Sequence, residues 1–176
     1  MEKRIIAVVG ATGAQGKGVV EQLVKDGTFD VRALTRNPDT YDGHAQQVKA
    51  VDLNNSDTLA EAFAGAYGVF VVTNFWEGAD EVTQGRNAVA AAKNAGVKHF
   101  IWSSLPDVEA ISGGAFTVPH FTGKAKVDAA VKQAGFEYSS VVQPPFYYQN
   151  FTGMLAPSQR KTDQQVGRCR WTQQRR

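Results

Sequence analysis

Short runs of apolar, mostly β-branched residues alternate along this chain with longer segments in which apolar residues recur at helical spacing. The short runs predict strands at residues 5–9, 31–35, 47–51, 69–73, 99–103 and 139–142. The longer segments predict helices at residues 14–25, from a cap at Ser56 to about 64, 80–94, and from 121 to 133 or 134. This alternation indicates an α/β fold with a doubly wound parallel sheet, for which we expect the strand order 3-2-1-4-5-6.

The alternating pattern stops after Leu155. Between Pro157 and Arg176, six Lys or Arg residues stand against one Asp, a local charge of +5, whereas the rest of the chain carries 13 basic and 16 acidic residues. We therefore expect one domain over residues 1–155 and an irregular, disordered basic tail over 156–176. A basic tail can bind nucleic acid, but this one lacks a basic helix or an aromatic platform, so we expect no nucleic-acid partner.

Composition narrows the class of protein. The hydrophobic fraction of 43% and the charged fraction of 20% are those of an ordinary globular domain. The single cysteine, Cys169, excludes an internal disulfide framework and offers no metal cluster. The N-terminal apolar run, Ile5–Val9, is too short for a signal peptide or a membrane span. We expect a cytoplasmic protein with no membrane attachment and no metal site.

A glycine-rich turn, GATGAQG at residues 10–16, directly follows the first strand and opens the first helix. Gly10 permits the tight turn, Gly13 lets the backbone approach a pyrophosphate, and Gly16 lets the helix pack against the strand. The amides and the positive end of the helix dipole then hold the phosphates. Although the GxxGxxG spacing is a variant, its place between strand and helix predicts a Rossmann domain that binds a dinucleotide.

The end of the second strand indicates which dinucleotide is bound. Domains that bind NAD usually carry an acidic residue there for the ribose hydroxyls, whereas this chain has Arg36. A guanidinium binds a 2′-phosphate through charge-assisted hydrogen bonds of about 1.5–3 kcal/mol, enough for roughly ten- to hundredfold preference. Arg36 therefore predicts a preference for NADP(H) over NAD(H). The alternative interpretation is that Arg36 is a solvated surface residue. Asp52, after the third strand, is placed either to meet the adenine amino group or to form a turn.

The segments GATGAQG, TRNP, VTNF, HFTGK and PPFYYQNF together resemble the NmrA-like family of atypical short-chain dehydrogenase/reductases over about residues 3–155. That family includes NADP-binding redox sensors and transcriptional regulators, and it is similar to isoflavone-reductase-like and quinone-reductase-like enzymes. The resemblance implies cofactor contacts from Gly10, Thr12, Gly13, Ala14, Gln15, Arg36, Asp52, Leu53, Thr73, Asn74, Phe75, Lys124 and Tyr147 to Asn150.

Within that set, the resemblance implies that Lys124 reaches the nicotinamide ribose and that Tyr147 to Asn150 close over the nicotinamide end. Phe75 and Tyr147 equally fit a role in core packing. Full members of the family carry a further region that caps the substrate, and we expect that region to be largely missing here. The polar, arginine-rich residues 158–176 suggest an out-of-frame or artificial ending.

The candidates for chemistry are Lys124, His120 and Ser103. Short-chain dehydrogenases use Tyr-x-x-x-Lys, in which the lysine lowers the pKa of the tyrosine four positions earlier on the helix. Here His120 occupies the tyrosine position, where it either donates a proton or merely starts the helix. Ser103 ends the fifth strand, at the edge where ligands bind such sheets, and would polarise a carbonyl. Ser104 is the weaker candidate because it fits a simple turn.

Two functions are consistent with these candidate residues. In the first, the protein binds NADP(H) and reports its level, through a protein partner or a conformational change, without efficient turnover. In the second, it transfers hydride from NADPH to a quinone or a similar small acceptor, with Lys124 as proton donor or electrostatic support. The missing tyrosine favours the first.

Overall fold

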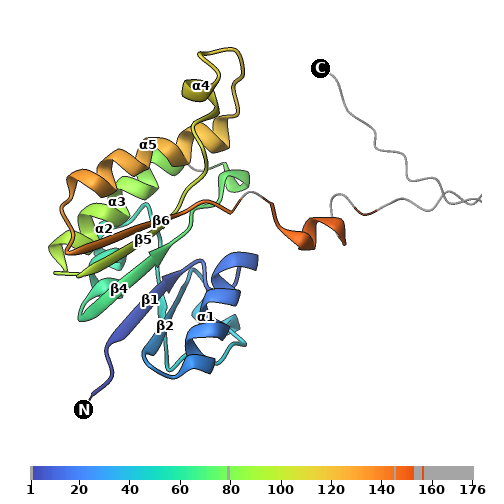
Figure 1. The fold of residues 1–176 in the computed structure, drawn as a ribbon. Helices are drawn as coiled ribbons and strands as arrows, with labels where there is room; N and C mark the ends of the chain where they lie inside the picture. Colours follow the sequence, from blue (N-terminus) through green and yellow to red (C-terminus); the bar gives the residue numbers. More distant parts are fainter. Residues whose placement is uncertain (1, 79, 145, 153–155, 157–176) are drawn as a thin grey trace, which may run out of the picture. The chain divides into compact units, whose positions relative to one another are not determined.

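Six parallel strands form a single sheet in the order β3-β2-β1-β4-β5-β6, which confirms the predicted topology (Figure 1). A computed structural model of the chain describes residues 2–78, 80–144, 146–152 and 156. The strands are β1 (Ile5–Val9), β2 (Asp30–Thr35), β3 (Gln47–Ala50), β4 (Ala66–Val71), β5 (His99–Ser103) and β6 (Tyr138–Val142).

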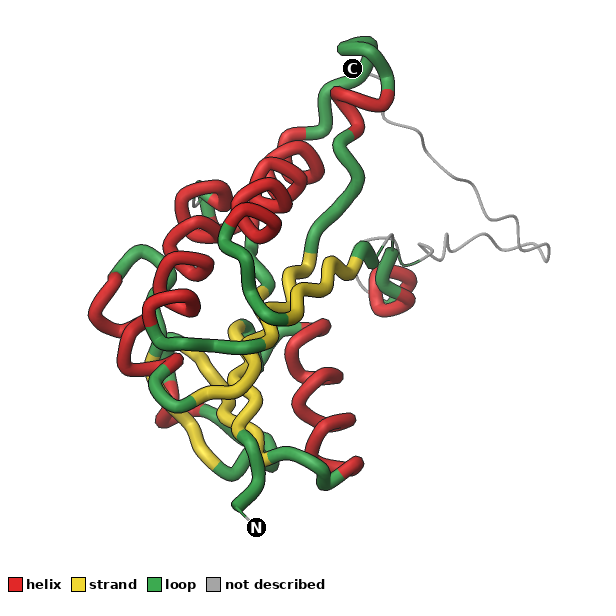
Figure 2. Tube along the Cα trace, turned by 60° about the vertical axis from the view of Figure 1, so that its left-hand side comes forward, coloured by secondary structure: helices red, strands yellow, loops and turns green. Residues whose placement is uncertain are grey.

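Helices cover both faces of the sheet, as Figures 1 and 2 show. The α-helices are α1 (Ala14–Asp26), α2 (Ser56–Phe63), α3 (Glu81–Asn94), α4 (Val108–Ile111) and α5 (Pro119–Gln133). Short 3-10 helices are η1 (Pro38–Thr40), η2 (Phe75–Glu77) and η3 (Tyr148–Phe151). Helix α1 lies on one face of the sheet, and α2, α3 and α5 lie side by side on the other.

Two hydrophobic layers fix this arrangement because successive strand residues point to opposite faces. On one face, Val20 of α1 packs with Ile6, Val8 and Phe70 of the strands. On the other face, the side chains of α2, α3 and α5 enclose Trp102, which is completely buried. Burying both faces in this way is what a doubly wound sheet requires, so the apolar pattern of the sequence accounts for the layers.

Several element boundaries differ from the sequence-based expectation. Strand β4 starts and ends earlier than predicted, because its ladder with β1 begins opposite Ile5 and β1 itself ends at Val9. Helix α5 begins two residues before the predicted start because Pro119 occupies its first turn, where the missing N–H is no loss. Asn55, and not Ser56, caps α2 by accepting a hydrogen bond from the Asp57 N–H. The unpredicted α4 is a single four-residue turn capped by Asp107.

The chain consists of two units, Met1–Pro144 and Pro145–Arg176. The first unit holds the whole sheet and helices α1 to α5. In the described part of the second unit, the ring centres of Phe146 and Phe151 lie 5.2 Å apart, and Phe151 is the last residue of η3. Apart from Ala156, the predicted basic tail lies outside the described residues. No described helix has both the length and the apolar character needed to cross a bilayer.

Candidate functional site

The carboxyl ends of the parallel strands meet at one edge of the sheet, and there the structure gathers the predicted residues of the first unit. Strand β1 lies between β2 and β4, so the glycine-rich turn that follows it stands at the centre of that edge. Arg36 follows β2 on one side. Thr73 and Ser103 stand at or just beyond the ends of β4 and β5 on the other side. This is the switch point at which open α/β sheets bind ligands.

The glycine-rich turn leaves no room for side chains at two of its three glycines. Gly10 has a φ of +72°, and a Cβ there would lie 2.8 Å from the Val72 Cγ1 atom. A Cβ at Gly16 would collide with the carbonyl oxygen of Gly10, so Gly16 lets α1 approach the turn, as predicted. Gly13 precedes α1 with an extended backbone and is exposed.

The first turn of α1 is open to an anion. Its N-cap, Gly13, has no side chain to cap the helix, and the first turn holds no acidic residue. By contrast, Asn55 caps α2 and Asp80 caps α3, each through a side-chain oxygen. Thr12 and Ala14 beside the cap are exposed. The backbone amides of a helix end left in this state can bind phosphate oxygens.

On the β2 side of the turn, Arg36 is exposed immediately after the buried Thr35, and its contact with a 2′-phosphate stays a prediction. Asp52 accepts hydrogen bonds on Oδ1 from the Asn54 backbone N–H at 2.9 Å and from its side-chain amide at 3.0 Å. Asp52 therefore forms a turn, the second of its two interpretations, and a contact with adenine stays a prediction. Leu53 packs partly against the core.

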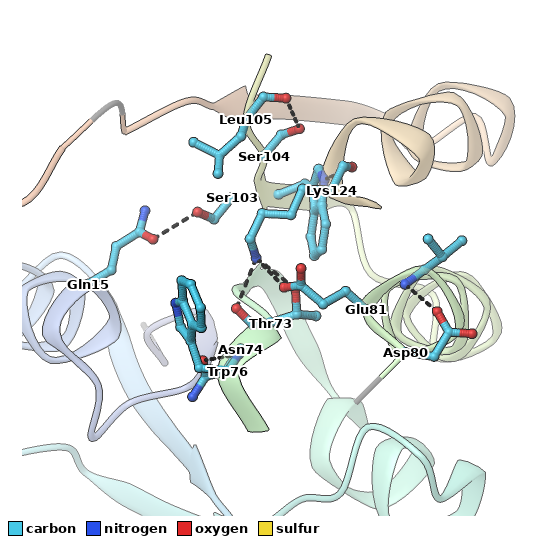
Figure 3. A network of polar contacts seen from close by, with 12 residues as sticks. Gln15, Thr73, Asn74, Trp76, Asp80, Glu81, Ser103, Ser104, Leu105 and Lys124 are labelled. Atoms are coloured by element: carbon cyan, nitrogen blue, oxygen red, sulfur yellow. Dashed lines mark hydrogen bonds and ion pairs between the residues drawn. The ribbon is translucent and has the colours of Figure 1, made fainter. Parts of the chain in front are cut away.

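On the β4 side, a buried polar network surrounds the ammonium group of Lys124 (Figure 3). The Lys124 Nζ atom lies 2.9 Å from the Thr73 carbonyl oxygen, 2.8 Å from the Thr73 Oγ1 atom and 2.8 Å from the Glu81 Oε1 atom. The Thr73 hydroxyl in turn donates to Glu81 Oε1 at 2.6 Å. The side chains of Lys124 and Glu81 are only 10% and 3% exposed.

This network occupies every donor of the lysine. An ammonium group has three N–H bonds, and each has an acceptor within hydrogen-bonding distance. Burial lowers the pKa of Lys124, and the adjacent carboxylate of Glu81 counters part of that shift. The ammonium is also 5.6 Å from the centre of the Trp102 ring. The structure thus places Lys124 at the predicted edge of the sheet, and its contact with a ribose stays a prediction.

Ser103 connects the end of β5 to the first turn of α1. Its hydroxyl donates to the Gln15 Oε1 atom of α1 at 2.8 Å, and Figure 3 shows the two side chains facing each other. Ser103 is 2% exposed, and its proton is engaged in this bond. Ser104 is completely buried, and its hydroxyl bonds to the Leu105 carbonyl oxygen at 3.3 Å, as expected of a residue that turns the chain.

His120 is the second residue of α5 and belongs to an aromatic cluster that consists of Phe75, Trp76, His120 and Phe121. The His120 ring centre lies 5.5 Å from those of Phe75 and Trp76 and 4.9 Å from that of Phe121. Trp76 is 73% exposed. Asn74 caps η2 by accepting a hydrogen bond from the Trp76 N–H at 3.2 Å. His120 therefore starts the helix, and a proton-donating role stays a prediction.

Tyr147 and Asn150 belong to the second unit, so their predicted place over a nicotinamide also stays a prediction. The sequence-based reasoning missed Glu81 and Trp76. The signal for Glu81 was present: it falls on the same helical face as Gln84, Gly85 and Ala88, all buried. A carboxylate on the buried face of a helix requires a partner. The described residues contain no group of three or more His, Cys, Asp or Glu side chains that could hold a metal ion.

Comparison with known proteins agrees with this geometry. The sequence profile of the NmrA-like family matches residues 2–174. FrzB of Cladobotryum sp, named an NmrA-like family domain-containing oxidoreductase, is 39% identical over 161 residues, which are 84% of this chain and 48% of the relative. The chain thus spans about half the length of curated relatives that it matches.

Among solved structures, the chain is similar to NmrA, described as a negative transcriptional regulator. The TM-score is 0.71 at 31% identity, covering 85% of this chain and 48% of NmrA. NmrA has been crystallised both with NADP and with NAD. The NADPH-dependent quinone oxidoreductase QOR2 of Escherichia coli, at 24% identity with a TM-score of 0.68 over 84% of this chain and 51% of its own, shares the fold.

Proposed function

The chain belongs to the NmrA-like family, and from that premise we propose that it binds NADP(H) in preference to NAD(H) and serves as a redox sensor or regulator without efficient turnover. In this role the bound dinucleotide changes what the protein presents to a protein partner. The observation that carries the proposal is the ammonium group of Lys124, whose three N–H bonds are all engaged by protein acceptors.

The open first turn of α1 supports dinucleotide binding. Its amides and dipole would hold the pyrophosphate, with the adenosine toward the end of β2 and the nicotinamide toward the ends of β4 and β5. Gly16 keeps the helix close enough to the turn for this. In this arrangement the hydrogen bond between Ser103 and Gln15 would hold the start of α1 beside the end of β5.

Arg36 supports the preference for NADP(H). It follows β2 directly, is exposed, and stands where domains selective for NAD carry a carboxylate. A carboxylate would repel a 2′-phosphate, whereas a guanidinium donates paired, charge-assisted hydrogen bonds to it. NmrA itself has been crystallised with either dinucleotide, so the preference rests on Arg36 of this chain.

The surroundings of Lys124 and His120, the two candidate proton donors among the described residues, support slow turnover. In the Tyr-x-x-x-Lys arrangement, the lysine presents its charge to the tyrosine and the ligand. Here Lys124 donates inward to Thr73 and Glu81, and His120, in place of the tyrosine, lies in the aromatic cluster. A hydride acceptor that needs a proton in the transition state would find neither group presented to it.

A second function has its own support. The relative FrzB is named an oxidoreductase, and the exposed Trp76 offers a flat apolar surface close to the β4 end of the edge. These features fit an NADPH-dependent reductase of quinones or similar small acceptors, whose reduction needs little acid assistance. Nicotinamide would supply the hydride, and Lys124 would stabilise the negative charge that develops on the acceptor.

A paired measurement of binding and turnover tests the proposal. Calorimetric titration with NADPH is expected to show binding, while the nicotinamide absorbance of an NADPH and quinone mixture is expected to fall no faster with the protein than without it. Fast oxidation of NADPH by the parent chain, lost in Lys124→Ala at saturating NADPH, would replace the sensor with the reductase. Absence of binding by the folded chain would contradict both.

A further inference from the structure

We propose that Thr73 and Glu81 are positioning residues for Lys124, and that the Thr73 hydroxyl occupies the N–H bond of Lys124 that a ribose hydroxyl of the bound dinucleotide takes. This inference rests on the proposed function, since it concerns the same site. According to this proposal, a hydroxyl group of the ligand replaces one of the protein acceptors of Lys124 in the network that Figure 3 shows.

The need for an exchange follows from the donor count. Lys124 has three N–H bonds and three acceptors, namely the Thr73 carbonyl oxygen, the Thr73 Oγ1 atom and the Glu81 Oε1 atom. No N–H bond remains for a ligand hydroxyl while all three are engaged. A direct contact between Lys124 and the dinucleotide therefore requires that one acceptor give way.

The three acceptors differ in what their loss would leave behind. Without Lys124, the carboxylate of Glu81 would be a buried, unpaired charge, and its second oxygen, Oε2, already has no hydrogen-bond partner among the described residues. A Thr73 carbonyl oxygen without a partner would be a buried, unsatisfied acceptor. The Thr73 hydroxyl keeps its own bond to Glu81 Oε1 at 2.6 Å, so it gives way at the least cost.

The other groups around the ammonium do not compete for this role. Trp102 presents its ring face from β5, with the centre 5.6 Å from Nζ. Burial raises the pKa of Asp128, one turn later on α5, and its Oδ1 atom has no hydrogen-bond partner among the described residues. His120, one turn earlier, lies in the aromatic cluster. Glu81 is thus the carboxylate that holds the charge of Lys124 within the described residues.

Thr73→Val tests the exchange because it keeps the β-branched shape and removes the competing hydroxyl. Calorimetric titration with NADP⁺ is expected to show binding about three- to tenfold tighter than that of the parent chain. Thr73→Ser restores the hydroxyl and is expected to lose that gain. Thr83→Val is the matched control, because the Thr83 hydroxyl also donates to a carboxylate at 2.6 Å, but on the exposed start of α3.

Glu81→Gln gives an independent readout through pH. The neutral amide no longer supports the charge of Lys124, whose pKa burial already lowers. The affinity of this variant for NADP⁺ is expected to fall as pH rises, over a range in which that of the parent is constant. A purely structural role would lower the affinity equally at every pH.

The outcomes separate this inference from the proposed function. If the parent binds NADP⁺ but Thr73→Val binds no more tightly and the pH profile of Glu81→Gln runs parallel to that of the parent, the exchange is wrong and the proposed function stands. If the folded parent does not bind at all, both are wrong. Circular dichroism of each variant confirms that folded chains are compared.

Discussion

The hydroxyl of Ser103 donates to the side-chain carbonyl oxygen of Gln15 at 2.8 Å, joining residues 88 positions apart in the sequence. Ser103 ends β5, and Gln15 lies in the first turn of α1, beside the glycine-rich turn. The bond therefore ties the start of α1 to the β5 side of the sheet edge. The same bond engages the proton of the Ser103 hydroxyl, and the carbonyl-polarising role of Ser103 stays a prediction.

A double-mutant cycle on this pair is expected to show coupling. Ser103→Ala and Gln15→Ala each break the same hydrogen bond, so the double variant should lose less stability than the sum of the single variants. The expected coupling energy is about 0.5–1.5 kcal/mol, measured by urea unfolding. Strictly additive losses would mean that the bond contributes nothing to the position of α1.

Gly16→Ala is expected to destabilise the chain by about 2–3 kcal/mol and to abolish dinucleotide binding, because the added methyl group meets the carbonyl oxygen of Gly10. Gly18→Ala, two residues further along the same helix, is the control, since nothing lies within 4 Å of its Cβ position. That variant should gain roughly 0.5–1 kcal/mol from its helix propensity. Equal melting temperatures for the two variants would contradict this account of the turn.

Lys124→Met is expected to cost about 3–5 kcal/mol of unfolding free energy, since it leaves the carboxylate of Glu81 buried without its partner. The double variant Lys124→Met/Glu81→Leu removes both charges and should recover most of that loss. Chemical denaturation of the single and double variants provides the comparison. A double variant as unstable as the sum of its parts would show that the ion pair is not the origin of the effect.

His99 should make the fold sensitive to mild acid. Burial lowers its pKa below the ordinary value of 6.5, so the unfolded chain takes up the proton first as pH falls. At higher pH the residue is neutral in both states and contributes no pH dependence; near and below its ordinary pKa it lowers stability. Between about pH 7.5 and 5.5, the melting temperature of His99→Asn should therefore fall less than that of the parent chain. The same change at the exposed His44 serves as control.

The sequence predicted the fold well where the signals are local. β1 and β5 have the predicted bounds, because β1 is an uninterrupted apolar run that ends before Gly10 and the apolar core of β5 lies between the polar His99 and Ser103. The bounds of β4 depend on where its neighbour β1 starts and stops, and that is a relation between strands rather than a property of either one. The four-residue α4 lies in a segment whose glycines and serines also fit a loop.

The same distinction holds for the candidate site. The places of Gly16 and Arg36 were predictable because both follow from a position beside a strand end, and the selection of NADP(H) by Arg36 stays a prediction. The partners of Lys124 were not, because Thr73 and Glu81 are 51 and 43 positions away and meet it only in the folded chain. Pairings across the fold, such as that of Ser103 with Gln15, carry no sequence signal of their own.

The most direct test is calorimetric titration of the folded chain with NADP⁺ and, separately, with NAD⁺, repeated on Arg36→Ala and on the exposed control Arg86→Ala. We predict that the parent and Arg86→Ala prefer NADP⁺ by roughly ten- to hundredfold, and that Arg36→Ala loses this preference through weaker NADP⁺ binding alone. Equal affinity of the parent for the two dinucleotides, or no binding of either, would contradict the account.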